Sequence, residues 1–349
     1  MTTFTSVSDA VTVVSAPPRR RAAHRGRVIR AAVGFTGWLL RTAAIVIPVF
    51  LFATFITYAL GAVSGLSPAG LKLGDSATDA DVARVNAEFG LDQPLPIRYL
   101  SWLGGILQGD LGTSWFNDLA VAPQILQRLE VSVSVAGLAL LIGIVGGTAL
   151  GLLAAVTRGS IIDRGVTAFC TLIATLPPFV VAIALIVVFS VTLRWLPSAG
   201  YVSPSVDLGR WLSLIILPAV ALSLDTVADL ARQLRTGLAG AYRENYVTGA
   251  IVRGLSKRRI LFVHVLRNGS GPALAILGMR VPALLGGAVV TESIFGMAGF
   301  GRFASESALR GDVPVVQGTL VVAIVLVLAF NLLVNGLLVR LRPAARRAV

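Results

Sequence analysis

Apolar residues gather into six long runs along the chain, and segments rich in charge, glycine and proline separate one run from the next. Each run is long enough to cross a bilayer core of about 30 Å as an α-helix, which takes roughly 20 residues. The pattern therefore predicts an all-α membrane protein with six transmembrane helices. The predicted spans are residues 39–62, 131–156, 166–193, 211–231, 271–292 and 314–339.

The segments around these runs divide the chain further. Residues 1–37 are polar, and their basic stretch PPRRR comes late, which favours a disordered arm over a signal peptide. A six-helix transmembrane domain is expected over residues 38–342, followed by a tail at 343–349. Two long connections interrupt the domain, an outer loop at residues 63–130 and a cytoplasmic loop at residues 232–269.

Charge is distributed unevenly between the two sides of this topology. The chain has 30 Lys and Arg residues against 17 Asp and Glu, a formal net charge of +13. If the amino terminus is cytoplasmic, most of the basic residues lie on cytoplasmic segments and most of the acids lie in outer loops. An excess of Lys and Arg on cytoplasmic loops is the positive-inside rule, so both termini are expected inside. Topology thus explains the basic excess, and no nucleic-acid partner is implied.

Few side chains offer catalytic, metal-binding or nucleotide-binding chemistry. The one cysteine, Cys170, lies inside a predicted span, and His24 and His264 are far apart, so no metal site is predicted. A phosphate-binding loop needs lysine directly after glycine, whereas Lys72 follows Leu and Lys257 follows Ser. With 55% hydrophobic residues, the composition also excludes a soluble enzyme. We expect a non-catalytic chain that binds no cofactor and draws its energy from elsewhere.

A basic segment, VTGAIVRGLSKRRILFVHVLRN at residues 247–268, separates the fourth and fifth runs. Residues 242–253 are expected to continue a helix beyond the membrane, which Gly254 ends, and Ser256 is a suitable N-cap for the next helix. Simple positive-inside anchoring and a membrane-surface helix are two interpretations. A third is a docking element for another protein, which the glycine break and the length of the segment favour.

Charged residues and prolines inside the runs are candidates for the translocation path. Pro177 and Pro178 predict a bend in the third span. Arg280 and Asp225 lie at similar depths in neighbouring spans, and a charge at such a depth requires a partner or a water-filled cavity. We expect these two side chains to interact, directly or through water, either to close a gate or to bind the charged ends of a zwitterionic peptide. Alternatively, Arg280 extends to cytoplasmic water alone; Asp229 is expected to be solvated.

Several stretches resemble the membrane permease subunit of bacterial ABC-type importers of the peptide and nickel branch (dipeptide and oligopeptide permease B-like). The similarity covers about residues 38 to 342, and it implies the type I ABC importer permease fold in the bacterial cytoplasmic (inner) membrane. The similar stretches are FGLDQPLPIRYLSWLGGILQGDLGTSW (89–115), WLPSAGY (195–201), YVTGAIVRGLSKRR (246–259), ESIFGMAGFGR (292–302) and GDVPVVQG (311–318).

In this family the loop that corresponds to the basic segment is a coupling helix, which sits in a groove on an ATPase subunit. The resemblance assigns this role to Thr248, Gly249, Ala250, Gly254, Leu255, Ser256, Lys257, Arg258 and Arg259. The chain departs from the family's loop motif, because Thr248 replaces a glutamate, Gly249 an alanine and Arg267 a proline.

The resemblance also implies partners, namely a second homologous permease subunit, two ATPase subunits or domains that bind ATP and Mg²⁺, membrane lipid and an extracytoplasmic substrate-binding protein. Candidate contacts for the binding protein are Leu103, Trp115, Phe300 and Phe303, although these outer loops could instead plug the outer mouth of the bundle. Dipeptides, oligopeptides, nickel chelates, glutathione and haem-like ligands all remain possible cargoes. A stand-alone secondary transporter or channel is the alternative function, and a membrane-embedded enzyme is a third class.

Overall fold

The computed structural model describes residues 20–63 and 78–341, and the predicted tail at 343–349 lies outside these residues. Contacts divide the chain into two units, residues 1–53 and 54–349. Helix α1 (Arg20–Val63) begins inside the segment that was expected to be a disordered arm, so residues 20–37 are helical. Alanine and arginine, which are frequent there, are strong helix formers, and this propensity outweighs the polar composition.

The described part of the second unit consists of helices and the loops that join them, and it contains no strand. A surface helix α3 (Asp79–Glu88) and α4 (Leu95–Leu107) precede α5 (Val121–Val156). The next helices are α6 (Ile161–Thr175), α7 (Pro178–Leu185), the π-helical η2 (Ile186–Thr192), α8 (Leu208–Ala241) and α9 (Asn245–Val252). They are followed by α10 (Lys257–Arg259), η3 (Ile260–Val265), α11 (Leu266–Gly269), α12 (Gly271–Ile294), α13 (Phe300–Leu309) and α14 (Val313–Leu341).

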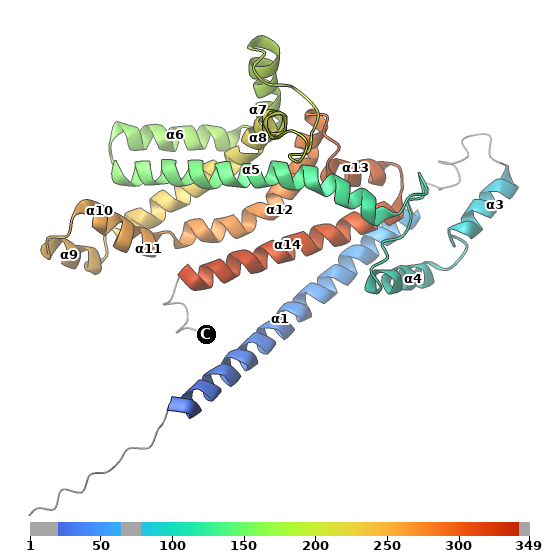
Figure 1. The fold of residues 1–349 in the computed structure, drawn as a ribbon, viewed down its shortest axis with the longest axis horizontal. Coiled ribbons are helices and arrows are strands. Elements are labelled where there is room, and N and C mark those ends of the chain that lie inside the picture. Colours follow the sequence, from blue (N-terminus) through green and yellow to red (C-terminus); the bar gives the residue numbers. More distant parts are fainter. Residues whose placement is uncertain (1–19, 64–77, 342–349) are drawn as a thin grey trace, which may run out of the picture. The chain divides into compact units, whose positions relative to one another are not determined.

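The helices agree with the predicted spans in position. Among the described residues, four helices are long and apolar enough to cross a membrane, and the number rises to six if each of two bent helix pairs forms one span. The six-span count and the cytoplasmic placement of both termini therefore stay predictions. Figure 1 shows α9, α10 and α11 together at one end of the bundle of α5, α8, α12 and α14, while α13 lies toward the other end.

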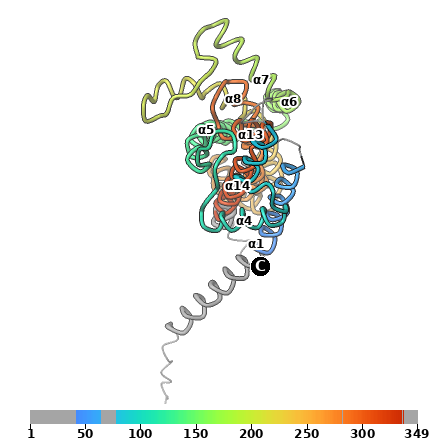
Figure 2. The backbone as a smooth tube through the Cα atoms, turned by 90° about the vertical axis from the view of Figure 1, so that its right-hand side faces the viewer, coloured from blue at the N-terminus to red at the C-terminus, as the bar shows by residue number. Residues whose placement is uncertain are grey.

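The predicted bend at Pro177 and Pro178 is present. Helices α6 and α7 meet at 100°. Leu176 is extended, with ψ of 125°, because a residue before proline avoids the helical region, and Pro178 then starts α7 at its first position. Figures 1 and 2 show α7, η2 and the loop that follows projecting from the bundle.

A stripe of glycines lets α5 approach α8 closely. A Cβ atom at Gly143 would lie 2.6 Å from Thr226 Cγ2, and one at Gly147 would lie 2.8 Å from Leu230 Cβ. The glycines recur every four residues and so share one face of α5, as small-residue packing between membrane helices requires. The buried Cys170 of α6 packs beside this pair of helices, next to Ala228 and Ala231 of α8.

Two of the family-like outer stretches are joined by a single carboxylate. Asp312, which is 4% exposed and precedes α14, accepts hydrogen bonds from Ser114 Oγ at 2.5 Å and from Trp115 N at 3.1 Å. Five residues further on, Gln317 Nε2 donates to Thr54 O at 2.9 Å. The two bonds to Asp312 fix the loop before α5 to the start of α14, and the bond from Gln317 joins α14 to α1.

Candidate functional site

The basic segment folds as a broken helical hairpin between α8 and α12. Gly254 has φ of +73°, and a Cβ atom there would meet nothing within 4 Å, so the turn needs glycine for its backbone angle and not for space. Ser256 Oγ accepts a hydrogen bond from Arg259 N at 3.4 Å and caps the helical stretch that follows. Both local predictions, the glycine break and the serine cap, are confirmed.

The first half of the segment differs from expectation, because α8 does not continue through residue 253. It ends at Ala241, and a tight turn leads to α9 at Asn245. Arg243 N donates to Gly240 O at 3.0 Å, which tightens the chain there into a turn. The sequence at this point contains no proline, but Gly240 before the break and Asn245 after it are residue types that are frequent at helix ends.

One side of the segment is packed into the bundle and the other is exposed. Val247, Ala250, Ile260 and Val265 are at most 4% exposed and form one apolar cluster with residues of α5 and α8. The exposed side carries four apolar side chains, Ile251, Val252, Phe262 and Val263, each at least 52% exposed. Of the predicted coupling residues, Thr248, Ser256, Lys257, Arg258 and Arg259 are exposed, Gly249 and Leu255 are half-buried, and Ala250 is buried.

The basic segment is also held in place by Gly269, the residue that directly follows it, whose backbone lies very close to the backbone of α8. A Cβ atom at Gly237 of α8 would lie 2.1 Å from Gly269 O of α11, and a Cβ atom at Gly269 would lie 2.8 Å from Gly237 O. Neither position has room for a side chain. The contact holds α11 directly against α8, and sequence reasoning missed it because the two glycines are 32 positions apart.

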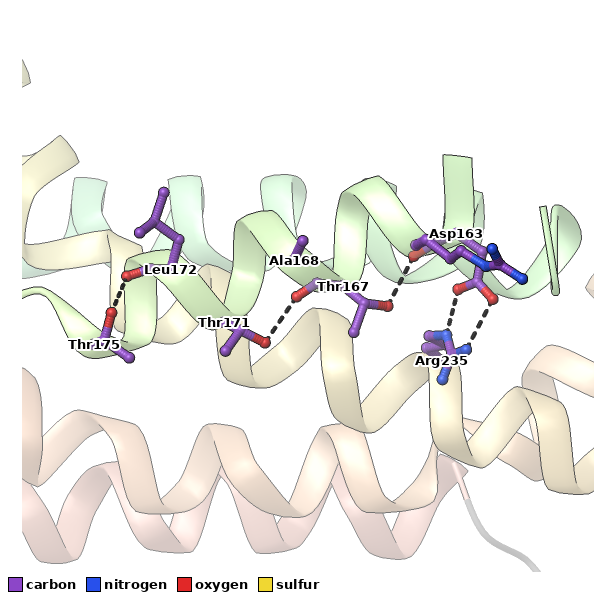
Figure 3. A pocket seen from close by; sticks show the side chains of 8 residues that line it. Asp163, Thr167, Ala168, Thr171, Leu172, Thr175 and Arg235 are labelled. Atoms are coloured by element: carbon purple, nitrogen blue, oxygen red, sulfur yellow. Dashed lines mark hydrogen bonds and ion pairs between the residues drawn. The ribbon is translucent and has the colours of Figure 1, made fainter. Parts of the chain in front are cut away.

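An ion pair fixes the start of α6 beside the same end of α8. Arg235 Nε donates to Asp163 Oδ1 at 2.5 Å and Arg235 Nη2 donates to Asp163 Oδ2 at 2.8 Å, while Gly159 N donates to Asp163 Oδ2 at 2.9 Å. Figure 3 shows the pair at one end of a cavity of about 670 Å³. The hydroxyls of Thr167, Thr171 and Thr175 follow along α6, and each donates to a backbone carbonyl of α6 itself.

The charges inside the predicted spans pair differently from the expectation. Arg280 of α12 forms its ion pair with Asp229 of α8, whose carboxylate also binds Arg232. The direct ion pair with Asp225 is not formed, whereas an interaction through water stays a prediction; the expectation that Asp229 is merely solvated is wrong. Among the described residues Asp225 forms no ion pair.

Helix direction explains the choice of Asp229. Leu222 of α8 meets Gly287 of α12, because a Cβ atom there would lie 2.9 Å from the leucine Cδ1. Seven residues, or two turns, along each antiparallel helix lead to Asp229 and Arg280. Side chains on a helix also lean toward its N-terminus, which for α12 is the end that carries the basic segment. Arg280 thus extends toward that end, as the alternative interpretation expected, but it meets a carboxylate there.

Most of the outer contact candidates are packed within the chain. Phe300 is 6% exposed and lies in a cluster with Val121, Ile125 and Val315, so its side chain is not available at the surface for the expected contact with a binding protein. The N-terminal turn of α13 folds onto α5, which its sequence did not reveal. Leu103 and Trp115 are half-buried, and Phe303 is half-buried under the Arg128 guanidinium, 3.9 Å from its ring centroid. The apolar residues that do face outward include Trp195 and Leu309, which are 70% and 79% exposed.

A buried glutamate organises the stretch before α13. The side chain of Glu292 is fully buried, and it accepts hydrogen bonds from Ser132 Oγ and from Arg302 N, the latter at 2.8 Å. Ser132 Oγ in turn accepts from Phe300 N at 2.8 Å. The two side chains satisfy free N–H groups in the first turn of α13, a role that its N-cap residue Gly299 cannot perform.

Glu292→Ala is expected to destabilise the protein strongly, because it leaves Arg302 N and the Ser132 hydroxyl without an acceptor. Each unsatisfied buried group costs about 1–3 kcal/mol of unfolding free energy. Glu306→Ala is the matched control, since it removes the half-exposed carboxylate that pairs with the Arg302 side chain and should cost less than about 1 kcal/mol. Thermal unfolding in detergent measures the stability of both variants. Equal melting temperatures for the two variants would contradict the capping role.

Comparison with known sequences identifies the family to which the chain belongs. The profile described as "Binding-protein-dependent transport system inner membrane component" matches residues 147–347, and a profile for the N-terminal part of such membrane components matches residues 36–136. The chain belongs to this family. It is therefore a multi-pass protein of the inner membrane and a permease component of a binding-protein-dependent transport system, which confirms the resemblance drawn from the sequence.

Curated relatives match the permease over most of its length. A putative peptide transport system permease protein of Brucella abortus is 38% identical over 89% of this chain and 99% of its own. The di/tripeptide transport system permease protein DppB of Pseudomonas aeruginosa is 32% identical, over 88% of this chain and 98% of its own. The dipeptide transport system permease protein DppB of Escherichia coli is 30% identical over the same shares.

A solved structure shares the fold. A chain of the inward-facing MetNI methionine ABC transporter superposes with a TM-score of 0.51 at 17% identity, over 62% of this permease and 96% of that chain. The similarity confirms the predicted ABC importer permease fold.

Proposed function

We propose that this permease is one of two related membrane subunits of an ATP-driven importer of small peptides. In this proposal the basic segment transmits the movement of an ATPase subunit to the transmembrane helices. The permease itself catalyses no reaction, and ATP and Mg²⁺ bind to the ATPase subunits. A substrate-binding protein delivers the peptide to the outer loops. The names of the relatives, which specify peptides, dipeptides and tripeptides, support the cargo.

The observation that carries the proposal is the two-sided construction of the basic segment. Its inner side is packed against α5 and α8, and the Gly237–Gly269 contact fixes its far end, so a push on the segment moves the helices with it. Its outer side exposes Phe262 and the cations of the KRR run to a partner. Coupling requires this combination, because a loosely attached loop absorbs movement instead of transmitting it.

The number of basic segments supports a second permease subunit. This chain supplies one segment, whereas a pair of ATPase subunits offers two grooves.

The contacts with the binding protein are proposed in the outer loops. There the exposed Trp195 and Leu309 are better placed than the buried Phe300, and Leu103 and Trp115 are partly available. These outer contacts belong to the proposal.

We assign the translocation path to the side of α8 and α12 that carries Arg280 and Asp229. Their side chains are 23% and 20% exposed in the isolated chain, and a partly exposed charge in a membrane region faces water or protein in preference to lipid. Asp225, which has no ion-pair partner among the residues that the structure describes, lies one turn further into α8, on the same face as Asp229. The bend at Pro177 and Pro178 offers a hinge at the edge of this path.

Gly254→Val is expected to abolish peptide-stimulated ATP hydrolysis in the complex with the ATPase subunits, because a β-branched residue at φ of +73° displaces the turn. Gly159→Val is the matched control: Gly159 has φ of +80°, lies in a turn at the same end of the bundle, and a Cβ atom there also meets nothing within 4 Å. Both variants carry a similar local strain, but Gly159 lies in the turn between α5 and α6, outside the basic segment.

The same assay on Lys257, Arg258 and Arg259 replaced together by glutamate tests the exposed charges without backbone strain. We expect insertion of the permease into the membrane but no stimulation by the loaded binding protein. Normal stimulation in both the triple variant and Gly254→Val would overturn the coupling role. Failure of any peptide to stimulate the wild-type complex, with intact basal hydrolysis, would instead overturn the cargo.

A further inference from the structure

A cavity of about 630 Å³ lies between the end of α5 and the basic segment. Its walls are mainly apolar. Val156, the last residue of α5, contributes one wall, and Ile251, Leu255 and Leu261 of the basic segment contribute others. The coupling role does not account for it, because an apolar recess on a segment that transmits force weakens the packing unless something fills it.

The lining of the cavity is also strongly basic. Arg158, from the turn between α5 and α6, and Lys257 and Arg258, from α10, all line it, and no acidic residue does. None of these three cations forms an ion pair with another residue that the structure describes, and the carboxylate of Asp163, near Arg158, is bound by Arg235. Three cations therefore line an apolar recess that contains no acidic residue, and none of the three has an ion-pair partner among the described residues.

The cavity lies at the end of the apolar, membrane-spanning part of α5. An exposed apolar stripe runs along α5 through Leu141 and Val145 to Val156, which are 57%, 61% and 59% exposed. These residues are four and eleven positions apart, so they share one side of the helix. The stripe ends at the cavity, just where the apolar span stops and Arg158 begins the basic turn. A hydrocarbon chain that lies along α5 would thus enter the recess from the bilayer.

From this geometry we propose that the cavity binds one anionic phospholipid of the inner membrane. The phosphate lies among Arg158, Lys257 and Arg258, and an acyl chain lies against Val156, Ile251 and Leu261. Basic pockets between helices at the cytoplasmic surface are suited to anionic headgroups, and the apolar wall supplies the second half of the same chemistry. The bound lipid fills the space between α5 and the basic segment, so it stiffens that junction. The inference does not depend on the peptide cargo. It shares Lys257 and Arg258 with the proposed ATPase contact, whereas Arg158 has no part in that contact.

The test is retention of lipid by the full-length permease, extracted in mild detergent and mixed with phosphatidylglycerol or phosphatidylcholine of equal chain length. Native mass spectrometry counts the bound lipids. We expect one molecule of phosphatidylglycerol to be retained in preference to phosphatidylcholine. Arg158→Gln should weaken its binding about fivefold, the factor that corresponds to one basic group near a lipid headgroup. The triple variant with Lys257→Gln and Arg258→Gln should lose the preference altogether.

Arg243→Gln is the matched control, because Arg243 is an exposed cation at the same end of the bundle that does not line the cavity. It should retain the lipid like the wild type. An equal loss in Arg243→Gln would overturn the site in favour of general attraction between basic loops and anionic lipid. Displacement of phosphatidylglycerol by an equal concentration of glycerol phosphate would show that the apolar wall contributes nothing, and would overturn it too.

The remaining outcome concerns a protein occupant. If the wild-type permease shows no preference for phosphatidylglycerol, yet Arg158→Gln lowers the affinity for the ATPase subunit about fivefold, the cavity receives an acidic part of that subunit and the lipid proposal is wrong. Thermal unfolding of each variant in detergent confirms that these exposed substitutions leave the fold intact.

Discussion

Gly237→Ala is expected to uncouple ATP hydrolysis from transport while the permease still inserts into the membrane. The added methyl group would lie 2.1 Å from Gly269 O, and the atom it meets belongs to a backbone, so α11 must move away from α8. Overpacking of this kind costs about 1–3 kcal/mol. Because the displaced α11 no longer follows α8, we expect a large loss of transport at nearly unchanged ATP hydrolysis.

Gly240→Ala is the control on the same helix, three residues further on. A Cβ atom at Gly240 meets nothing within 4 Å, so alanine there should be neutral or slightly stabilising. Peptide uptake into proteoliposomes and ATP hydrolysis are measured in parallel for both variants. We expect Gly237→Ala to hydrolyse ATP without uptake and Gly240→Ala to behave as the wild type. Equal uptake by the two variants would show that the close approach of α8 and α11 has no part in coupling.

Substitutions at Arg280 and Asp229 are expected to have strongly non-additive effects on the free energy of unfolding. Asp229→Asn leaves two arginines near one another with no carboxylate between them, and an unpaired arginine at the membrane centre costs about 2.5–3.5 kcal/mol on insertion scales. The partial exposure of the pair reduces this cost, so we expect about 1–3 kcal/mol in thermal unfolding. Arg280→Gln relieves much of the effect, and the double variant should be markedly more stable than the sum predicts.

Asp225→Asn supplies the comparison for this cycle, because Asp225 lies one turn away on α8 and forms no ion pair in the described part of the chain. Its effect on unfolding should add independently to that of Arg280→Gln. Uptake of peptides with blocked and free termini then tests whether Asp225 binds cargo. An interaction energy between Arg280 and Asp225 as large as that between Arg280 and Asp229 would contradict the pairing described here.

The features of this protein that depend on neighbouring residues could be predicted from its sequence. The apolar runs located the membrane helices because about 20 residues of helix cross a bilayer whatever surrounds them. Gly254 and Ser256 were placed correctly because a left-handed turn and an N-cap depend on a few neighbouring residues. The bend at Pro177 and Pro178 follows from the missing N–H and the restricted residue before it.

Features that depend on distant residues were not readable in the same way. Depth along a helix suggested Asp225 as the partner of Arg280, but the tilt of side chains toward the helix N-terminus selects Asp229. Phe300 looked like an outer contact until α13 was seen to fold onto α5. Nothing near Glu292 in the sequence indicates that Ser132, 160 positions earlier, completes its network.

The burial of Cys170 between α6 and α8 makes this permease convenient for labelling experiments. The thiol is 1% exposed and is the single cysteine of the chain, so a water-soluble maleimide has no native site to react with while the fold is intact. Cysteines introduced at exposed positions such as Ser256 and Trp195 can carry spectroscopic probes without first removing the native residue. Opening and closing of the transporter can then be followed in the otherwise unaltered sequence.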